Sequence, residues 1–228
     1  MNCGWFPAGI ILATLLNGCA TAPAPPAVPN LYDVKKELSQ YVSSGRYQAE
    51  VAAVYARAGA YLNRRAHGQS NLAIVLDVDE TVLSNLALLK LNDWTLYLSG
   101  PTNSVTGPCS LAEWIKLQRS EPIQPALDLV RAARARGVAV FLISARPESL
   151  REPTEKTLHA AGYEWNGLIL KPSKLRVKSE VEYKAPARQK LAEQGYTILM
   201  SVGDQESDLA GGFAERTFKL PNPFYFAP

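Results

Sequence analysis

Two aspartates stand two positions apart, directly after a continuous apolar run. The run covers residues 72–76, and Asp77-Val78-Asp79 follows it. On an extended chain, residues two apart point to the same side, so Asp77 and Asp79 can face one ligand. Two carboxyl groups pressed together separate in proton affinity, so that one can attack while ionised and the other can hold a proton for a leaving group. The pair therefore predicts nucleophilic and acid–base chemistry at the end of a strand.

Two further aspartates lie in the segment 203–208, Gly-Asp-Gln-Glu-Ser-Asp, which follows another apolar run. Brought together with the first pair, Asp204 and Asp208 would give the site an excess of negative charge. Oxygen ligands of this kind suit Mg²⁺, and a divalent cation would also let a carboxylate approach a phosphate dianion. We therefore expect Mg²⁺ as the cofactor.

Two groups that could hold phosphate oxygens complete the set. Ser144 follows a third apolar run, and Lys184 stands in a predicted loop before a helix. A hydroxyl and an ammonium group are both suitable donors to the oxygens of a phosphoryl group. Together with the acids, they predict phosphoryl transfer.

The pattern of apolar residues predicts the elements that position these groups. Continuous apolar runs of strand length are typical of strands buried on both faces of a parallel sheet. They alternate here with helical periodicity, which indicates an α/β fold: a doubly wound, Rossmann-like parallel sheet with helices on both faces. Ligands bind beyond the carboxyl ends of such strands, and there the predicted groups would converge. Strands are expected at 72–76, 138–143, 168–170, 198–202 and 217–220, and helices at 32–44, 47–66, 125–136, 148–161 and 186–194.

The segment 86–122 does not follow the alternation of strand and helix. It contains Trp94, Tyr97 and Trp114, and a stretch rich in Gly, Pro and Asn. We interpret it as a small insertion, or cap, after the first strand that lies over the edge of the sheet. Its aromatic side chains could stack on a substrate ring, although packing within the core or the cap is the more ordinary role for each of them.

Residues 77–85, Asp-Val-Asp-Glu-Thr-Val-Leu-Ser-Asn, are similar to the first motif of the haloacid dehalogenase (HAD) superfamily. The string most resembles the acid phosphatase subfamily, which includes bacterial class C lipoprotein acid phosphatases and plant vegetative storage acid phosphatases. Ser144 matches the second motif, Lys184 the third, and Gly-Asp-Gln at 203–205 with Asp208 the fourth. The resemblance extends from about residue 31 to about residue 220.

This resemblance implies a role for each matching residue. Asp77 would attack phosphorus and form an aspartyl-phosphate, and Asp79 would protonate the leaving alcohol and then activate water. Mg²⁺ would be bound by the side chains of Asp77 and Asp204 and by the backbone carbonyl of Asp79, while Asp208 supports its water shell. The resemblance implies that Ser144 and Lys184 bind the transferred phosphoryl group. Arg146 could also reach phosphate, but a surface ion pair is an equal expectation.

The first thirty residues predict export and anchoring rather than folding. Residues 5–16 form an apolar run that is too short for a permanent membrane span, and Leu-Asn-Gly-Cys at 16–19 resembles the lipobox of bacterial lipoproteins. We expect a signal peptide at 1–18, a lipid on Cys19, a Pro/Ala-rich tether at 19–30 and the phosphatase domain at 31–228. Ala20 after the cysteine favours the outer membrane, facing the periplasm; an ordinary cleaved signal is the alternative.

Composition narrows the classes of function further. The net charge is only +3, and the Lys and Arg residues are scattered, so solvated helix faces are a better interpretation than a nucleic-acid-binding surface. With Cys3 in the signal and Cys19 lipidated, Cys109 would be a single buried thiol.

The sequence therefore predicts a Mg²⁺-dependent acid phosphatase of the bacterial cell envelope that acts on small phosphate monoesters, nucleoside monophosphates being one candidate. Three alternatives stay open. One is a ligand-binding or storage protein that kept the fold and lost the chemistry, although Asp77 and Asp79 are both intact. Another is a phosphotransferase, since the same intermediate serves both reactions. The third is a surface lipoprotein that binds a partner, for which no His-rich or Cys-rich ligand set is present.

Overall fold

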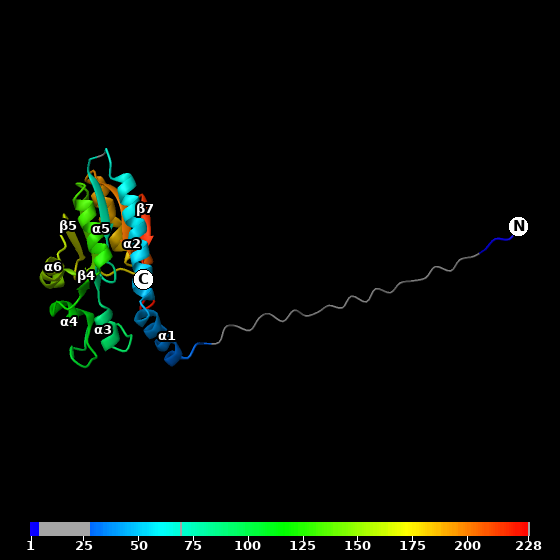
Figure 1. Ribbon diagram of the computed structural model, residues 1–228, viewed down its shortest axis with the longest axis horizontal. Coiled ribbons are helices and arrows are strands. Elements are labelled where there is room, and N and C mark those ends of the chain that lie inside the picture. Colours follow the sequence, from blue (N-terminus) through cyan, green and yellow to red (C-terminus); the bar gives the residue numbers. More distant parts are fainter. Residues whose placement is uncertain (5–27, 69, 228) are drawn as a thin grey trace.

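A five-stranded sheet forms the centre of the protein. The computed structural model describes residues 1–4, 28–68 and 70–227. The strands lie in the order β5-β4-β1-β6-β7, and every neighbouring pair is parallel. This arrangement confirms the predicted α/β fold (Figure 1). The strands are β1 (Leu72–Leu76), β4 (Ala139–Pro147), β5 (Gly167–Lys171), β6 (Thr197–Gly203) and β7 (Arg216–Lys219).

Helices cover both faces of the sheet. On one face, α2 (Arg46–Arg65) and α5 (Gln124–Arg134) pack on strand residues such as Ile74 and Leu142, within the larger hydrophobic core. On the other face, α7 (Val181–Glu193) packs on Val75 and Phe141. Successive residues of a strand point to opposite faces, so apolar runs bury both sides of the sheet at once. The remaining longer helices are α1 (Leu31–Ser43) and α6 (Arg151–Ala160).

The start of α7 differs from the prediction. We expected a helix from Pro186, with Lys184 in the preceding loop, but α7 begins at Val181. Pro186 removes only one backbone hydrogen bond, and Tyr183 and Ala187 still pack against the sheet from the same helix. Lys184 is therefore held on a helix, which fixes its position more firmly than a loop would.

The segment 86–122 is an insertion with a small core of its own. It contains α3 (Leu86–Leu91) and α4 (Leu111–Lys116), and its end forms a short antiparallel pair between β2 (Leu83–Ser84) and β3 (Glu121–Pro122). Leu88, Trp114 and the buried thiol of Cys109 pack together inside it. The insertion lies at one end of the sheet (Figure 1). It is thus placed beyond the carboxyl ends of the strands.

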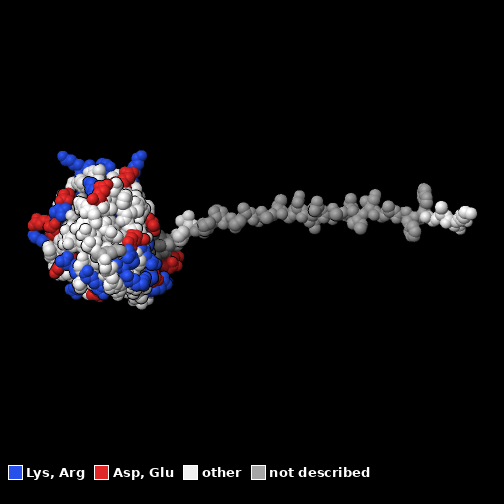
Figure 2. Space-filling view, turned by 90° about the horizontal axis from the view of Figure 1, so that it is seen from above, with Lys and Arg blue, Asp and Glu red and all other residues white. Residues whose placement is uncertain are grey.

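Most of the predicted export signal, Cys19 and most of the tether fall within residues 5–27, outside the described residues. Among the residues that are described, no helix combines the length and the apolar character needed to cross a bilayer. On the face seen in Figure 2, Lys and Arg are interspersed with Asp and Glu. This distribution agrees with the interpretation of solvated helix faces.

Candidate active site

The predicted site residues converge on one cavity at the carboxyl ends of the strands. Asp77 and Asp79 follow β1, Ser144 lies in β4, Lys184 in α7, and Asp204 follows β6. All five line a cavity of about 710 Å³. Asp208 is buried behind them in the short 3₁₀ helix that follows β6 and contacts Lys184.

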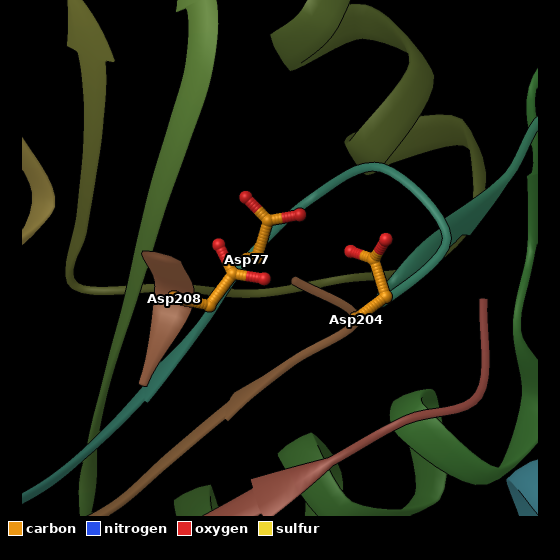
Figure 3. A group of neighbouring side chains, drawn as sticks. All are labelled: Asp77, Asp204 and Asp208. Carbon is orange, nitrogen blue, oxygen red and sulfur yellow. The ribbon is translucent and has the colours of Figure 1, made fainter. Parts of the chain in front are cut away.

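Three of the acids form a compact cluster. Oxygen atoms of Asp77, Asp204 and Asp208 all lie within 4.8 Å of one another, and all three side chains are buried. Figure 3 shows their carboxyl groups pointing to the same side. Three carboxylate donors so close together fit a hard divalent cation such as Mg²⁺. The structure therefore contains a suitable donor set where the sequence predicts one.

Lys184 supplies the positive charge nearest to the cluster. Its ammonium group donates to Asp77 Oδ1 at 2.7 Å and also to Asp208 Oδ1. Burial alone would lower the pKa of Lys184, but the two carboxylates outweigh it, and the pKa is raised. Burial raises the pKa of Asp77 well above its usual range, and the charges of Asp208 and Asp204 add to this, while Lys184 opposes it.

Asp204 is held by side chains from separate parts of the chain. The amides of Gln205 and Asn222 each donate to its Oδ2 at 2.6 Å, and the hydroxyl of Thr81 donates to Oδ1 at 3.3 Å. Burial, followed by the charge of Asp208, raises the pKa of Asp204 to about 6. A bound cation would favour the ionised form of the same group.

The loop that carries Asp208 is fixed from two sides. A Cβ atom at Gly203 would lie 2.2 Å from the Cβ of Asp208, so only glycine lets the two segments approach this closely. Arg188, one turn after Lys184 on α7, donates to the carbonyl oxygens of Asp208, Ala210 and Gly212. Because Arg188 is almost completely buried, this contact sets the path of the loop.

Asp79 forms a two-point ion pair with Arg146. Arg146 Nε lies 2.9 Å from Asp79 Oδ2, and Arg146 Nη2 lies 2.7 Å from Asp79 Oδ1. The alternative of a surface pair for Arg146 is wrong, since its side chain is only 1% exposed and also contacts Thr154. The sequence could not decide between the two roles of Arg146, because the exposure of one arginine side chain cannot be predicted from the residues around it.

The two aspartates of the pair differ in proton affinity. Burial tends to raise the pKa of Asp79, but the charge and hydrogen bonds of Arg146, with a bond from Asn85, lower it overall. Asp77 instead has the raised pKa because it is buried among like charges. The motif thus identifies the pair, whereas neighbours distant in sequence decide which carboxyl group holds a proton more tightly.

The end of the chain contributes groups that the sequence did not predict. The hydroxyl of Tyr225 donates to Glu80 Oε2 at 2.6 Å, and the backbone N–H of Asn85 donates to Glu80 Oε1 at 2.6 Å. Burial and the charge of Asp79 raise the pKa of Glu80 to about 8. Glu80 belongs to the recognised motif, but its partner lies 145 residues away and carries no local signal.

The aromatic residues of the insertion mostly serve packing. Trp94 stacks on Phe224 at a centroid distance of 5.7 Å, and Trp114 lies in the core of the insertion. Neither these two nor Tyr97 lines the cavity. Ser144 does line it, with its hydroxyl accepting a bond from the backbone N–H of Arg146 at 3.2 Å.

A parallel sheet whose central strand ends in Asp-x-Asp, with a lysine and two more acids at the same end, defines a HAD-type phosphatase. Comparison with known families agrees: residues 20–228 match the model described as HAD superfamily, subfamily IIIB (acid phosphatase). The chain therefore belongs to this family, and the acid phosphatases within it indicate a phosphoric monoester hydrolase.

Individual relatives support the assignment. Acid phosphatase 1 of Solanum lycopersicum is 31% identical over 192 residues, which cover 83% of this chain and 72% of that protein. Vegetative storage protein 1 of Arabidopsis thaliana is 30% identical over 231 residues, with 100% and 79% covered. The class C acid phosphatase of Bacillus anthracis has a similar structure, with a TM-score of 0.66 over 85% of this chain and 86% of that one. At 24% identity, this last similarity concerns the fold alone.

Proposed function

We propose that this protein is a Mg²⁺-dependent acid phosphatase that hydrolyses phosphate monoesters through an aspartyl-phosphate on Asp77. One observation carries the proposal: Asp77 lines the cavity, contacts Lys184 at 2.7 Å, and lies within 4.8 Å of the carboxylates of Asp204 and Asp208. A carboxylate that only capped a helix or faced solvent would need none of these neighbours.

In the first step, a carboxylate oxygen of Asp77 bonds to phosphorus while the bond from phosphorus to the alcohol oxygen breaks. Asp79 gives its proton to that oxygen. In the second step, Asp79 takes a proton from water, the water oxygen bonds to phosphorus, and the bond to Asp77 breaks, which releases inorganic phosphate. Lys184 and Ser144 line the same cavity, where they can donate to the phosphoryl oxygens.

Arg146 affects whether Asp79 is ionised or holds the proton that it gives to the leaving alcohol. While it pairs with Asp79, that carboxyl group stays ionised and cannot act as an acid. Arg146 also lines the cavity, so the oxygens of an arriving phosphate offer its guanidinium group a second anion. A turn of Arg146 towards phosphate would leave the partly buried carboxylate of Asp79 without its counter-charge, which favours its protonation.

The carboxylates of Asp77 and Asp204, with the backbone carbonyl of Asp79, would hold the cation, and Asp208 would support its water shell. When bound, Mg²⁺ would supply positive charge that lowers the repulsion between Asp77 and a phosphate dianion. The hydrogen bonds to Asp204 from Gln205 and Asn222 leave its Oδ2 oriented before any ligand arrives.

The test is phosphate release by the full chain from a panel of phosphate monoesters, with Mg²⁺ and with EDTA, beside Asp77→Asn. We expect metal-dependent turnover that falls by more than about 10,000-fold in the variant, because the attacking oxygen is lost. Trapping of a phosphoryl group on the wild-type chain, and not on the variant, would identify the intermediate. A folded protein that binds Mg²⁺ but turns over no ester would support the binding or storage alternative instead.

We also propose that the protein is a lipoprotein of a bacterial envelope, anchored through Cys19 to the outer membrane and facing the periplasm. The support is the apolar segment before Leu-Asn-Gly-Cys and the Pro/Ala-rich stretch between that cysteine and the first residue of α1. Labelled palmitate should be incorporated by the wild-type chain and not by Cys19→Ala in a bacterial host. Equal labelling of the two would rule the anchor out.

A further inference from the structure

Besides the catalytic groups, the cavity is lined by a set of mainly aliphatic side chains. It comes from three separate segments: the insertion, the loop between β5 and α7, and the end of the chain. We call it the aliphatic wall, and its main members are Leu96, Leu98, Leu111, Ile115, Leu175 and Phe226.

Several of these side chains are open to solvent. Leu98 is 69% exposed, Leu175 37% and Phe226 77%. Single exposed apolar residues are common, but three from distant segments that meet at one cavity form a patch of the kind that binds ligands. The patch adjoins the groups that would hold phosphate, so a substrate held by its phosphate would place its alcohol portion here.

Most of the charged and amide groups in the same wall make hydrogen bonds within the protein. Lys171 bonds to Glu180 at 2.7 Å, and Arg176 donates to the carbonyl oxygen of Ser173 at 3.2 Å. Gln205 donates to Asp204 and accepts from the backbone N–H of Ala227. Carbon is therefore the larger part of the surface offered to the leaving group, beside the hydroxyls of Ser99 and Ser173 and the exposed guanidinium group of Arg176.

We infer that the preferred substrates are phosphate monoesters of apolar alcohols, whose alkyl or aryl portion lies against the aliphatic wall while Asp77 attacks the phosphate. The inference rests on the proposed function and narrows its substrate class. A sugar or other polyhydroxyl leaving group would bring hydroxyls against carbon atoms that cannot hydrogen-bond to them.

The experiment compares n-alkyl phosphates from ethyl to hexyl with glycerol phosphate and a nucleoside 5′-monophosphate, using the full chain and Mg²⁺. The leaving alcohols of the alkyl series have nearly the same acidity, so differences in rate report on contacts beyond the phosphate. We expect kcat/KM to rise by about two- to fourfold for each added methylene. Calorimetry with ethyl- and hexylphosphonate, which are not hydrolysed, should give tighter binding of the longer ligand.

Variants then test whether this wall is responsible. In Leu98→Ser with Phe226→Ser, the rise of kcat/KM along the alkyl series should become at least about threefold smaller between ethyl and hexyl. Val105→Ser is the matched control, since Val105 is an exposed apolar residue of the same insertion that does not line the cavity. Val105→Ser should keep the full rise of kcat/KM from ethyl to hexyl phosphate.

The outcomes separate the two proposals. Turnover that is flat or falls along the alkyl series, or that is fastest with glycerol phosphate or the nucleotide, would overturn the apolar substrate class and leave the phosphatase intact. Absence of turnover with every ester would overturn the proposed function and, with it, the inference. A rise that survives in the double variant would assign the preference to other residues and reject the aliphatic wall.

Discussion

The cavity is lined by two groups of residues that are held together in different ways. One is the aliphatic wall, and the other, which we call the catalytic rim, consists of Asp77, Asp79, Ser144, Arg146, Lys184 and Asp204. On the rim, Arg146 and Lys184 are almost completely buried, and each contacts one or more carboxylates at close range. On the wall, Leu98 and Phe226 are largely exposed. A buried charge that loses its partner is costly, whereas an exposed apolar side chain can change at little cost. The rim should therefore tolerate few substitutions, and the wall many.

This difference would let the fold keep its chemistry while its substrates change. The rim is built from the ends of β1, β4 and β6 and from α7, which are fixed by the sheet. The wall belongs to an insertion, a loop and the end of the chain. Variation in such segments alters the fit of the leaving group and leaves the attacking group in place.

Among the residues of the site, the largest effect on stability is expected for Arg146→Met. The substitution removes a two-point partner from Asp79 and leaves a carboxylate without its counter-charge, so the free energy of unfolding should fall by about 3–5 kcal/mol. Urea denaturation measures this change. Arg134→Met is the matched control, because the Arg134–Glu164 pair is exposed and its loss should cost less than about 1 kcal/mol. Equal losses in the two variants would remove the distinction between the rim and the surface.

Glu80 should make the stability of the chain depend on pH. Its pKa is about 8 in the folded chain, against 4.5 as the ordinary value, so the folded state binds this proton more tightly. The resulting stabilisation is complete below about pH 4.5 and is lost as the pH rises to about 8.

From pH 5 to pH 8, the free energy of unfolding should therefore fall by about 3 kcal/mol more in the wild type than in Glu80→Gln, which cannot ionise. Urea midpoints at both pH values, in buffer with EDTA, measure the difference. Glu121→Gln serves as the control because Glu121 is exposed. If wild type and Glu80→Gln show the same dependence on pH, Glu80 is ionised throughout this range.

Asp208→Asn should weaken the metal requirement without removing the attacking group. Asp208 contacts Lys184 and lies among the carboxylates that could hold the cation. We expect the Mg²⁺ concentration for half-maximal activity to rise by about 10- to 100-fold. Titration of activity with Mg²⁺ measures the shift, with Glu206→Gln as a neighbouring exposed control. An unchanged Mg²⁺ requirement would place Asp208 outside the metal site.

The elements of the sheet could be predicted because their signal is local. The run at 72–76 has the same bounds as β1, and the run at 198–202 lies within β6. Strands buried on both faces need apolar residues at every position, so they are easily distinguished from their surroundings. The prediction of β1 also placed Asp77 and Asp79 correctly, since both residues come directly after this strand.

The partners of the site residues could not be predicted in the same way. Arg146 and Asp79 are 67 residues apart, and Tyr225 and Glu80 are 145 apart. Contacts over such separations depend on how the sheet and the end of the chain pack, which no local pattern records. The insertion could be delimited at 86–122 because it breaks the alternation, but its placement across the cavity depends on the same packing.

The smallest effect is expected for Phe226→Ala, and Phe224→Ala provides its comparison within the same short tail. Phe226 is exposed at the aliphatic wall, whereas Phe224 is buried against Trp94 and Tyr47. Loss of the Phe226 ring should change the free energy of unfolding by no more than about 0.5 kcal/mol, while loss of the Phe224 ring should cost about 3–5 kcal/mol. Urea denaturation of the two variants measures both values. A large loss at Phe226 would mean that its ring holds the tail over the cavity, and the wall would then be part of the rigid core instead of a surface that can vary with the substrate.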